Sequence, residues 1–199
     1  MIERLGSHYG GWWADLSKLN SNSVVYSVGV GEDVTFDVAL IERVHCVVHA
    51  FDPTPKSLAW ISKQALSPLF VMHPIGLSSS DELKNFYLPE KEEWVSHTLF
   101  PRDGDTRPPI VCEFRKLSTL MTVLKHSHID LLKMDIEGAE LEVFDDLVAD
   151  SIVVHQLNVE VHGDVEGAVA YAQQQLMKRD LILLKREGPN LFFEVTHDT

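Results

Sequence analysis

The sequence has little positive charge and no long apolar run. Its 199 residues include 17 Lys and Arg against 30 Asp and Glu, which gives a formal net charge of −13. A nucleic-acid-binding protein needs a positive surface, so no nucleic-acid partner is expected. No segment approaches the ~20 apolar residues of a membrane span, and the first residues lack the apolar core of a signal peptide. We therefore expect a cytoplasmic protein with no membrane span.

Cysteine is also scarce, and no stretch is of low complexity. The two cysteines, Cys46 and Cys112, lie within apolar, strand-like runs. This position favours buried free thiols over a disulfide or a metal pair. Hydrophobic residues make up 45% of the chain, as in ordinary globular proteins. No repeat or linker divides the sequence, which indicates a single domain over residues 1–199.

Apolar runs and helical spacings alternate along the chain. Strands are expected at 24–28, 45–51, 69–75, 129–134 and 152–161, and helices at 33–43, 55–65, 117–126, 139–149 and 165–179. The last two strands, 181–185 and 191–196, flank the turn-forming residues 187–190. This order predicts an α/β fold: a mostly parallel seven-stranded sheet with helices on both faces and an antiparallel terminal hairpin.

A glycine turn and an acid follow the first two expected strands. Gly29 and Gly31 come directly after the first strand, and Asp52 ends the second. Glycine allows a ligand to approach the backbone, and an acid at this place can accept hydrogen bonds from ribose hydroxyls. A glycine turn and an Asp-Pro strand end are the purely structural alternative. The spacing favours a cofactor that contains a nucleoside.

The residues that follow the two glycines help to identify this cofactor. A dinucleotide fingerprint requires a third glycine where this chain has Val34, so NAD and FAD are disfavoured. Glu32 and Asp33 lie at the start of the next helix, where a pyrophosphate would bind. Acids there suit a positively charged ligand without phosphate. S-adenosylmethionine, which carries a sulfonium and an ammonium, fits this description.

The second half contributes a group of ionisable residues. Asp135 ends the strand 129–134, and Glu160 and His162 are two apart near the end of a neighbouring strand, so the three are expected at one mouth. His162 or Asp135 is a candidate base, and Glu160 is expected to orient His162 or anchor a loop. A backbone cap is the alternative for His162. The same trio resembles a divalent metal site, although its spacing does not require a metal and none is predicted.

Further acids lie just after Asp135. Glu140 and Glu142 fall in the first turn of the next expected helix. Acids in a first helical turn are favoured by the helix dipole. We therefore assign both to helix stabilisation.

Several segments together resemble one known family. The block Leu131–Glu140 is similar to the signature of FkbM-type, class I S-adenosylmethionine-dependent methyltransferases. The surrounding blocks Val25–Gly31, Ala50–Pro53 and Leu157–His162 are also similar, and Gly10–Trp12 suggests the methyltransferase-like branch of that family. The resemblance covers about residues 6–196. It implies a Rossmann-like fold.

The resemblance also implies which residues bind the cofactor and which depart from the family. It places S-adenosylmethionine, with S-adenosylhomocysteine as product, against Val28, Gly29, Gly31, Asp52, Pro53, Leu77, Ser78 and Asp135. The family's usual acid before the glycines is replaced by Ser27, and its third glycine by Asp33. The role of the missing acid then falls to Glu32, Asp33 or Asp135.

The expected function is O-methylation of a hydroxyl on a small molecule or sugar. Residues 6–75 would bind the cofactor, 78–115 would form an insertion that selects the substrate, and 116–199 would form the catalytic half. The alternative is a domain that binds the cofactor without turnover, which the loss of the acid at Ser27 favours.

Overall fold

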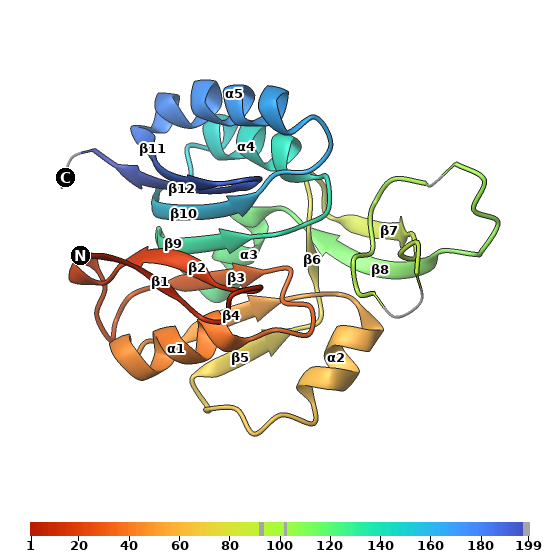
Figure 1. Ribbon diagram of the computed structural model, residues 1–199, viewed down its shortest axis with the longest axis horizontal. Coiled ribbons are helices and arrows are strands. Elements are labelled where there is room, and N and C mark those ends of the chain that lie inside the picture. Colours follow the sequence, from red (N-terminus) through yellow and green to blue (C-terminus); the bar gives the residue numbers. More distant parts are fainter. Residues whose placement is uncertain (92–93, 102, 197–199) are drawn as a thin grey trace.

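Seven strands form one twisted sheet at the centre of the molecule (Figure 1). The computed structural model describes residues 1–91, 94–101 and 103–196. The strand order is β11–β12–β10–β9–β3–β4–β5. β12 is antiparallel to both of its neighbours, and the remaining pairs are parallel. The predicted fold class is confirmed. The strands are β3 (Val25–Val28), β4 (Val48–Phe51), β5 (Phe70–His73), β9 (Ile129–Met134), β10 (Val154–Glu160), β11 (Leu181–Glu187) and β12 (Asn190–Val195).

Helices cover both faces of this sheet because side chains alternate along each strand. On β9, Leu132 and Met134 pack with α3 (Leu117–Leu124), α4 (Glu140–Ala149) and α5 (Val165–Leu176). Leu131, which points to the opposite face, packs against α1 (Thr35–Val44). The short helix α2 (Pro55–Ile61) lies on this second face too, where Ile61 joins the cluster around Ala50.

The strand order reverses between β3 and β9. From β3 the chain proceeds to β4 and β5 on one side, and from β9 to β10 on the other. The connections after β3 and β9 therefore diverge and leave a crevice at their carboxyl ends, which is where open α/β sheets bind ligands.

An N-terminal hairpin was not predicted. The strands β1 (Ile2–Leu5) and β2 (Trp12–Asp15) pair in antiparallel register. Each strand is four residues long and the loop between them lacks periodicity, so no local pattern indicates this hairpin.

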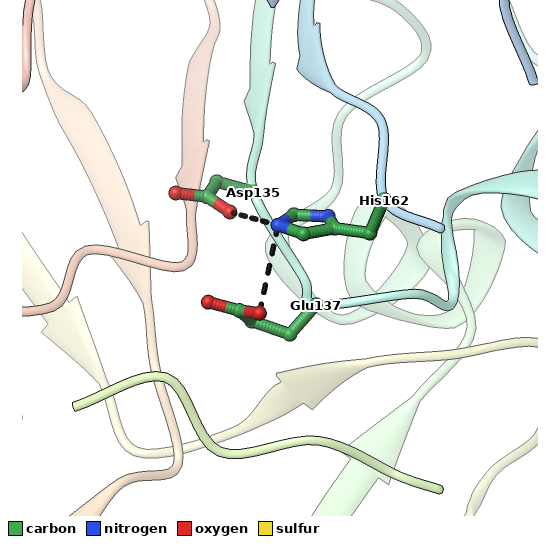
Figure 2. Close-up of side chains that lie close together, drawn as sticks. All are labelled: Asp135, Glu137 and His162. Atoms are coloured by element: carbon green, nitrogen blue, oxygen red, sulfur yellow. Dashed lines mark ion pairs between the residues drawn. The ribbon is translucent and has the colours of Figure 1, made fainter. Parts of the chain in front are cut away.

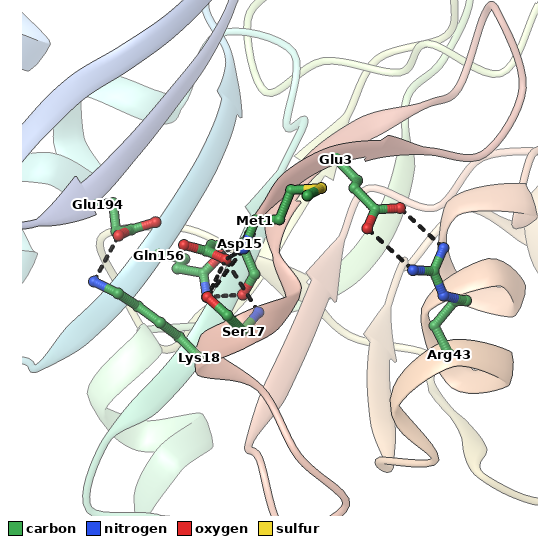
Figure 3. Close-up of polar contacts among 8 residues, drawn as sticks. All are labelled: Met1, Glu3, Asp15, Ser17, Lys18, Arg43, Gln156 and Glu194. Carbon is green, nitrogen blue, oxygen red and sulfur yellow. Dashed lines mark hydrogen bonds and ion pairs between the residues drawn. The ribbon is translucent and has the colours of Figure 1, made fainter.

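Side-chain amides of β10 fasten this hairpin to the sheet. Asn158 accepts a hydrogen bond from the Trp13 N–H at 3.2 Å and donates to the carbonyl oxygen of the same residue at 2.6 Å. Gln156 bonds Asp15 in the same way, at 2.7 and 3.2 Å. Ion pairs of Glu3 with Arg43 and of Lys18 with Glu194 add surface contacts (Figure 3).

Residues 76–115 form a second, smaller sheet beside the crevice (Figure 1). The strand β8 (Ile110–Arg115) pairs with β6 (Gly76–Leu77) in parallel and with β7 (Glu82–Phe86) in antiparallel orientation. This smaller sheet falls in the part of the sequence that was expected to form an insertion, between the cofactor-binding and catalytic halves.

Several predicted elements are shorter than expected. The helix expected over 55–65 ends at Ile61, and the one expected over 165–179 ends at Leu176, with a 3₁₀ turn (η2, Met177–Arg179) after it.

Cys46 and Cys112 are buried free thiols, as expected. Among the helices that the structure describes, none combines the length and apolar character needed to cross a membrane.

Three histidines lie together at the β3–β4–β5 side of the sheet. His49 Nδ1 lies 3.1 Å from His73 Nε2, and the Tyr26 hydroxyl lies 2.8 Å from His126 Nδ1. His126 is partly buried, and this contact links it to β3. Burial lowers the pKa of His49 to about 4, and the charges of His73 and His126 act in the same direction.

This pKa shift predicts acid destabilisation. Unfolded His49 takes up a proton near its usual pKa of 6.5, whereas folded His49 does so only near 4. Its contribution to stability is therefore complete above pH 6.5 and is lost as the pH falls towards 4. We expect the free energy of unfolding of the wild type to fall, relative to that of a His49→Phe variant, by about 2 kcal/mol between pH 7 and 4.5, after allowance for partial exposure. Urea titrations at each pH measure it, and parallel curves for the two proteins would contradict it.

Candidate functional site

A cavity of about 910 Å³ opens at the carboxyl ends of β3, β4, β9 and β10. Small-molecule sites usually occupy ~300–1,000 Å³, so this cavity has room for a cofactor and a second small ligand. The expected site residues that line it are Val28, Gly29, Gly31, Asp52, Pro53, Leu77, Asp135, Glu160 and His162. Ser78 is not among the described lining residues, because its buried hydroxyl donates a hydrogen bond to the Ser80 carbonyl oxygen instead.

Gly29 is required for a reason that the sequence analysis did not anticipate. Its φ is +72°, and a Cβ there would lie 1.6 Å from the carbonyl oxygen of Asp135. The close approach is therefore made by the neighbouring β9–α4 connection rather than by a ligand. Gly31, with φ +60°, faces more open space, where a Cβ would meet only the Val95 side chain at 3.4 Å.

The backbone N–H groups of this turn already have acceptors within the protein. Gly29 N–H donates to the Phe51 carbonyl oxygen at 2.9 Å, and Gly31 N–H donates to Asp52 Oδ2 at 2.9 Å. The N-cap position of α1 belongs to Val34, but Asp33 Oδ1 accepts the Thr35 N–H at 2.8 Å. A phosphate would need these donors, so the turn is poorly suited to bind one.

Asp52 presents a buried carboxylate to the cavity. Its Oδ1 accepts the Thr54 N–H at 2.8 Å, and its Oδ2 accepts the Gly31 N–H, so the side chain is held in one orientation. A carboxylate has about four acceptor positions, of which these bonds use two. The remaining positions can accept hydrogen bonds from a pair of hydroxyls. Pro53 and Leu77 supply apolar surface nearby.

Lys133 is a buried cation beneath the glycine turn. Its ammonium donates hydrogen bonds to the carbonyl oxygens of Val28 and Gly29 and lies 5.2 Å from the centre of the Trp12 ring. Burial raises the pKa of Asp37 to about 6, and Lys133 opposes the shift. Lys133 was not predicted as a site residue. A lysine inside the otherwise apolar run 129–134 was the signal that could have identified it.

Ser27 does not present a charge where the family usually has an acid. Its side chain is buried on β3, in the strand that leads to the glycine turn. Glu32, Asp33 and Asp135 all line the cavity, but Asp33 also accepts hydrogen bonds from Ser7 and Thr35. Glu32, which is exposed, and Asp135 retain more capacity for a ligand.

Asp135 follows the last residue of β9. Its N–H donates to the Val28 carbonyl oxygen at 3.1 Å, which places it beside the glycine turn. Its Oδ1 is buried and accepts no hydrogen bond from any residue that the structure describes. Burial raises the pKa of this carboxyl to about 7, while the charge of Lys133 acts against the rise.

His162 lies among three carboxylates. Its Nε2 is 3.8 Å from Asp135 Oδ1 and 3.5 Å from Glu137 Oε2 (Figure 2). On the other side of the ring, Nδ1 donates a hydrogen bond to Glu140 Oε1 at 2.8 Å. Burial lowers the pKa of His162, but the bond to Glu140 and the charges of Glu140, Glu137 and Asp135 outweigh burial and raise it to about 9.

Glu140 lies in the first turn of α4, as predicted, but it also has contacts at the site that were not predicted. Glu140 is only 2% exposed, and besides His162 it accepts a hydrogen bond from the Gly138 N–H at 3.0 Å. It shares a helix face with Val143, Phe144 and Leu147, at the spacing i, i+3, i+4 and i+7, so its burial could have been deduced from the sequence. Glu142 remains at the surface and bonds Ser79.

Glu137 was not predicted as a site residue. Glu160 was expected to orient His162 or to anchor a loop. Glu137 adopts φ +55°, an unusual conformation for a residue with a side chain, in the turn between β9 and α4. Glu160 lines the cavity, but no hydrogen bond or ion pair joins it to His162 in the described part of the chain. Burial raises the pKa of Glu160.

The insertion borders the same cavity. Trp94, Val95, Ser96 and His97 line it, together with Phe86 of β7. Trp94 is half exposed, and Lys91 lies over its ring. On the opposite side His8, Tyr9 and Gly10, from the loop between β1 and β2, complete the rim. Trp12 both packs in the hydrophobic core and lines the cavity.

Two curated relatives are similar to this chain over much of its length. The chain is 28% identical over 151 residues to the probable methyltransferase-like protein 24 of Homo sapiens, which covers 72% of this chain and 33% of that protein. It is 26% identical over 180 residues to the protein of the same name from Rattus norvegicus, which covers 87% of this chain and 42% of that protein. The chain thus spans well under half the length of these relatives.

Two solved structures are more distant. The structure of a fibrillarin/Nop5p complex matches 88% of this chain and 72% of its own chain, with 11% identity and a TM-score of 0.49. The Methanococcus jannaschii fibrillarin pre-rRNA processing protein matches 90% of this chain and 68% of its own, with 8% identity and a TM-score of 0.49.

A family model confirms the resemblance seen in the sequence blocks. The methyltransferase FkbM domain matches residues 21–188, which include the glycine turn, Asp52, the β9–α4 connection and His162. By this match the chain belongs to the FkbM methyltransferase family.

Proposed function

We propose that this chain binds S-adenosylmethionine and methylates a hydroxyl oxygen of a small molecule or sugar. The observation that carries the proposal is the arrangement of one cavity with two chemically different sides. Gly31 and the buried Asp52 form one side, and Asp135 and His162 form the other. The first suits a nucleoside and the second suits an acceptor whose proton must be removed.

The cofactor side fits a nucleoside that carries no phosphate. The N–H groups of Gly29 and Gly31 are bonded within the protein, and Asp33 occupies the start of α1, so an anion gains little there. Asp52 would accept hydrogen bonds from the ribose hydroxyls, and Leu77 and Pro53 would contact the base. This chemistry favours S-adenosylmethionine over a nicotinamide dinucleotide.

The acceptor side supplies positioning and a proton acceptor. S-adenosylmethionine, held by Asp52, Pro53 and Leu77, would supply a methyl group on a sulfonium, whose C–S bond would break as the C–O bond to the acceptor forms, with S-adenosylhomocysteine as the product. Asp135, whose pKa is raised to about 7, would take the proton from the acceptor hydroxyl near neutral pH, and His162 would do so only above its pKa of about 9; Glu140 would hold the imidazole in place through Nδ1. Alignment of the two ligands would supply much of the rate enhancement.

A second candidate is a domain that binds the cofactor but has no turnover. It is favoured by the buried Ser27, which leaves the family's usual acid without a direct replacement on β3. The chain spans only part of the length of its relatives, so in this second candidate the turnover would depend on residues from other segments of a longer protein.

His162→Gln tests the proposed reaction. Formation of S-adenosylhomocysteine would be followed with a panel of sugars, polyols and phenols as acceptors. We expect turnover with at least one acceptor, and above about pH 9, where His162 is mostly neutral, we expect the variant to lose about 10²–10³-fold in kcat because it lacks this proton acceptor. Its affinity for S-adenosylhomocysteine should change by less than about twofold, since cofactor contacts come from other residues.

The matched control is His155→Gln. His155 lies near the start of β10, whereas His162 follows the end of that strand, so this variant should behave as the wild type. Equal turnover by the His162→Gln variant and the wild type would exclude His162 as the base. Cofactor binding without turnover on any acceptor would favour the second candidate.

A further inference from the structure

We propose that Asp135, Glu137 and His162 bind one divalent transition-metal cation of the Mn²⁺ type. One oxygen of each carboxylate and one ring nitrogen lie within 4.8 Å of one another at the cavity wall (Figure 2). The side chains come from the turn after β9 and the loop after β10, which are adjacent strands. This set differs from the expected trio, because Glu137 takes the place of Glu160.

The distances leave space for an ion between the three side chains. His162 Nε2 lies 3.5 Å from Glu137 Oε2 and 3.8 Å from Asp135 Oδ1, both beyond the ~2.7–3.2 Å of a direct hydrogen bond. An ion ~2.1 Å from each ligand atom requires ligand atoms about 3.0–3.4 Å apart, for octahedral to tetrahedral angles. Side-chain movements of a few tenths of an ångström would bring the two distances from Nε2 into that range, and the carboxylate oxygens of Asp135 and Glu137 lie within 4.8 Å of each other.

The kind of donor selects the class of metal. Two carboxylates with one imidazole form the ligand set of many first-row metal sites that keep open positions. Mg²⁺ and Ca²⁺ prefer oxygen ligands alone, so the imidazole favours a first-row transition metal, and the two carboxylates favour one that readily accepts oxygen ligands, such as Mn²⁺. The open positions would face the cavity.

A buried carboxylate orients the imidazole for this role. Glu140 accepts the Nδ1–H bond of His162, and as a carboxylate it cannot donate, so Nδ1 carries the hydrogen. Nε2 is then directed at Asp135 and Glu137. A carboxylate bonded to the far nitrogen of a histidine ligand is the usual outer support of a metal site.

An unbonded oxygen gives independent support. Asp135 Oδ1, the atom that faces His162 Nε2, is buried and has no hydrogen-bond donor among the described residues. Buried polar atoms are normally paired, because an unpaired one loses its hydration without compensation. A cation between Asp135 and His162 would satisfy this oxygen.

The site would also act on the acceptor, a role that rests on the proposed function. A cation at the cavity wall can bind a hydroxyl oxygen, or both oxygens of a vicinal diol, and lower the pKa of the hydroxyl, so that its proton can pass to water while Asp135 and His162 act as ligands rather than as the base. Acceptors with two adjacent hydroxyls would then be favoured over those with one.

Electron paramagnetic resonance with Mn²⁺ tests the site without cofactor or acceptor. We expect one Mn²⁺ per chain, an affinity at least 10-fold lower in Glu137→Gln, and a 10- to 100-fold loss in Glu140→Gln, which removes the carboxylate that orients His162 without removing a ligand. His155→Gln is the matched control. His155 also pairs with an acid, Asp130, at 3.1 Å, but at the other end of β10, and its removal should leave Mn²⁺ binding unchanged.

The outcomes separate the metal site from the proposed function. The same preparations would be titrated with S-adenosylhomocysteine in EDTA, and circular dichroism would verify that each variant is folded. No stoichiometric Mn²⁺ binding, equal binding in all variants, or loss in His155→Gln alone would overturn the metal site. Cofactor binding together with any of these results would leave the proposed function standing. Mn²⁺ binding without cofactor binding would support the metal site and contradict the proposed function.

Discussion

Replacement of Gly29 with alanine is expected to lower the free energy of unfolding by more than about 4 kcal/mol, or to prevent folding. The new Cβ would overlap the Asp135 carbonyl oxygen at 1.6 Å and the carbonyl carbon at 2.7 Å. Both are backbone atoms, and the Asp135 N–H is bonded to Val28, so neither side of the contact can move without separating β3 from β9. Urea denaturation followed by circular dichroism measures the loss.

Gly188→Ala is the control for backbone conformation alone. Gly188 has φ +61° in the turn between β11 and β12, and no atom of the residues that the structure describes lies within 4 Å of the position of a Cβ. Only the left-handed conformation then disfavours alanine, by about 1–2 kcal/mol. Similar losses in Gly29→Ala and Gly188→Ala would mean that the contact between the glycine turn and the β9–α4 connection is not as close as described.

Asp52→Ala is expected to weaken the binding of S-adenosylhomocysteine by more than about 100-fold. The proposed ribose contacts would be two hydrogen bonds to a buried charge, each worth about 1.5–3 kcal/mol. The variant also removes the acceptor of the Gly31 N–H, so the turn itself becomes less fixed. Isothermal titration calorimetry measures the change in affinity.

The control for Asp52→Ala is another aspartate that accepts a backbone N–H. Asp164 caps α5 and accepts the Gly167 N–H at 3.2 Å, outside the described lining of the cavity. Asp164→Ala should lower stability by about 1 kcal/mol with unchanged cofactor affinity. Unchanged affinity in Asp52→Ala, with the fold intact, would remove Asp52 from the proposed nucleoside site.

The parallel sheet could be predicted because its strands are short apolar runs that end at glycines or acids. The strand 129–134 was predicted with its observed bounds, and Asp135 follows it as expected. The carboxyl ends of parallel strands meet at one edge, which is why Asp52, Asp135, Glu160 and His162 could be assigned to one cavity before the structure was known.

The N-terminal hairpin could not be predicted because long-range contacts hold it. β1 and β2 are four residues each, and their attachment depends on the amides of Gln156 and Asn158, more than 140 positions away along the chain. Within the strand pattern of β10 these two residues gave no indication of a partner. Local sequence therefore underestimated how firmly residues 2–15 belong to the fold.

The partners of His162 were missed for a similar reason. Glu137 contacts it from a turn with a left-handed backbone, which the sequence Ile136–Gly138 does not specify. The burial of Glu140 was deducible from its helix face, but its contact with His162 depends on the relative positions of α4 and the end of β10. Sequence could therefore identify the imidazole and one acid, but not the complete cluster.

Calorimetric titration of the folded protein with S-adenosylhomocysteine tests the central claim most directly, since it requires no knowledge of the acceptor. The proposed cavity predicts one binding site per chain with a dissociation constant in the micromolar range, and no comparable binding of NADH. Absence of binding by the folded wild-type protein, or preferential binding of NADH, would contradict the account.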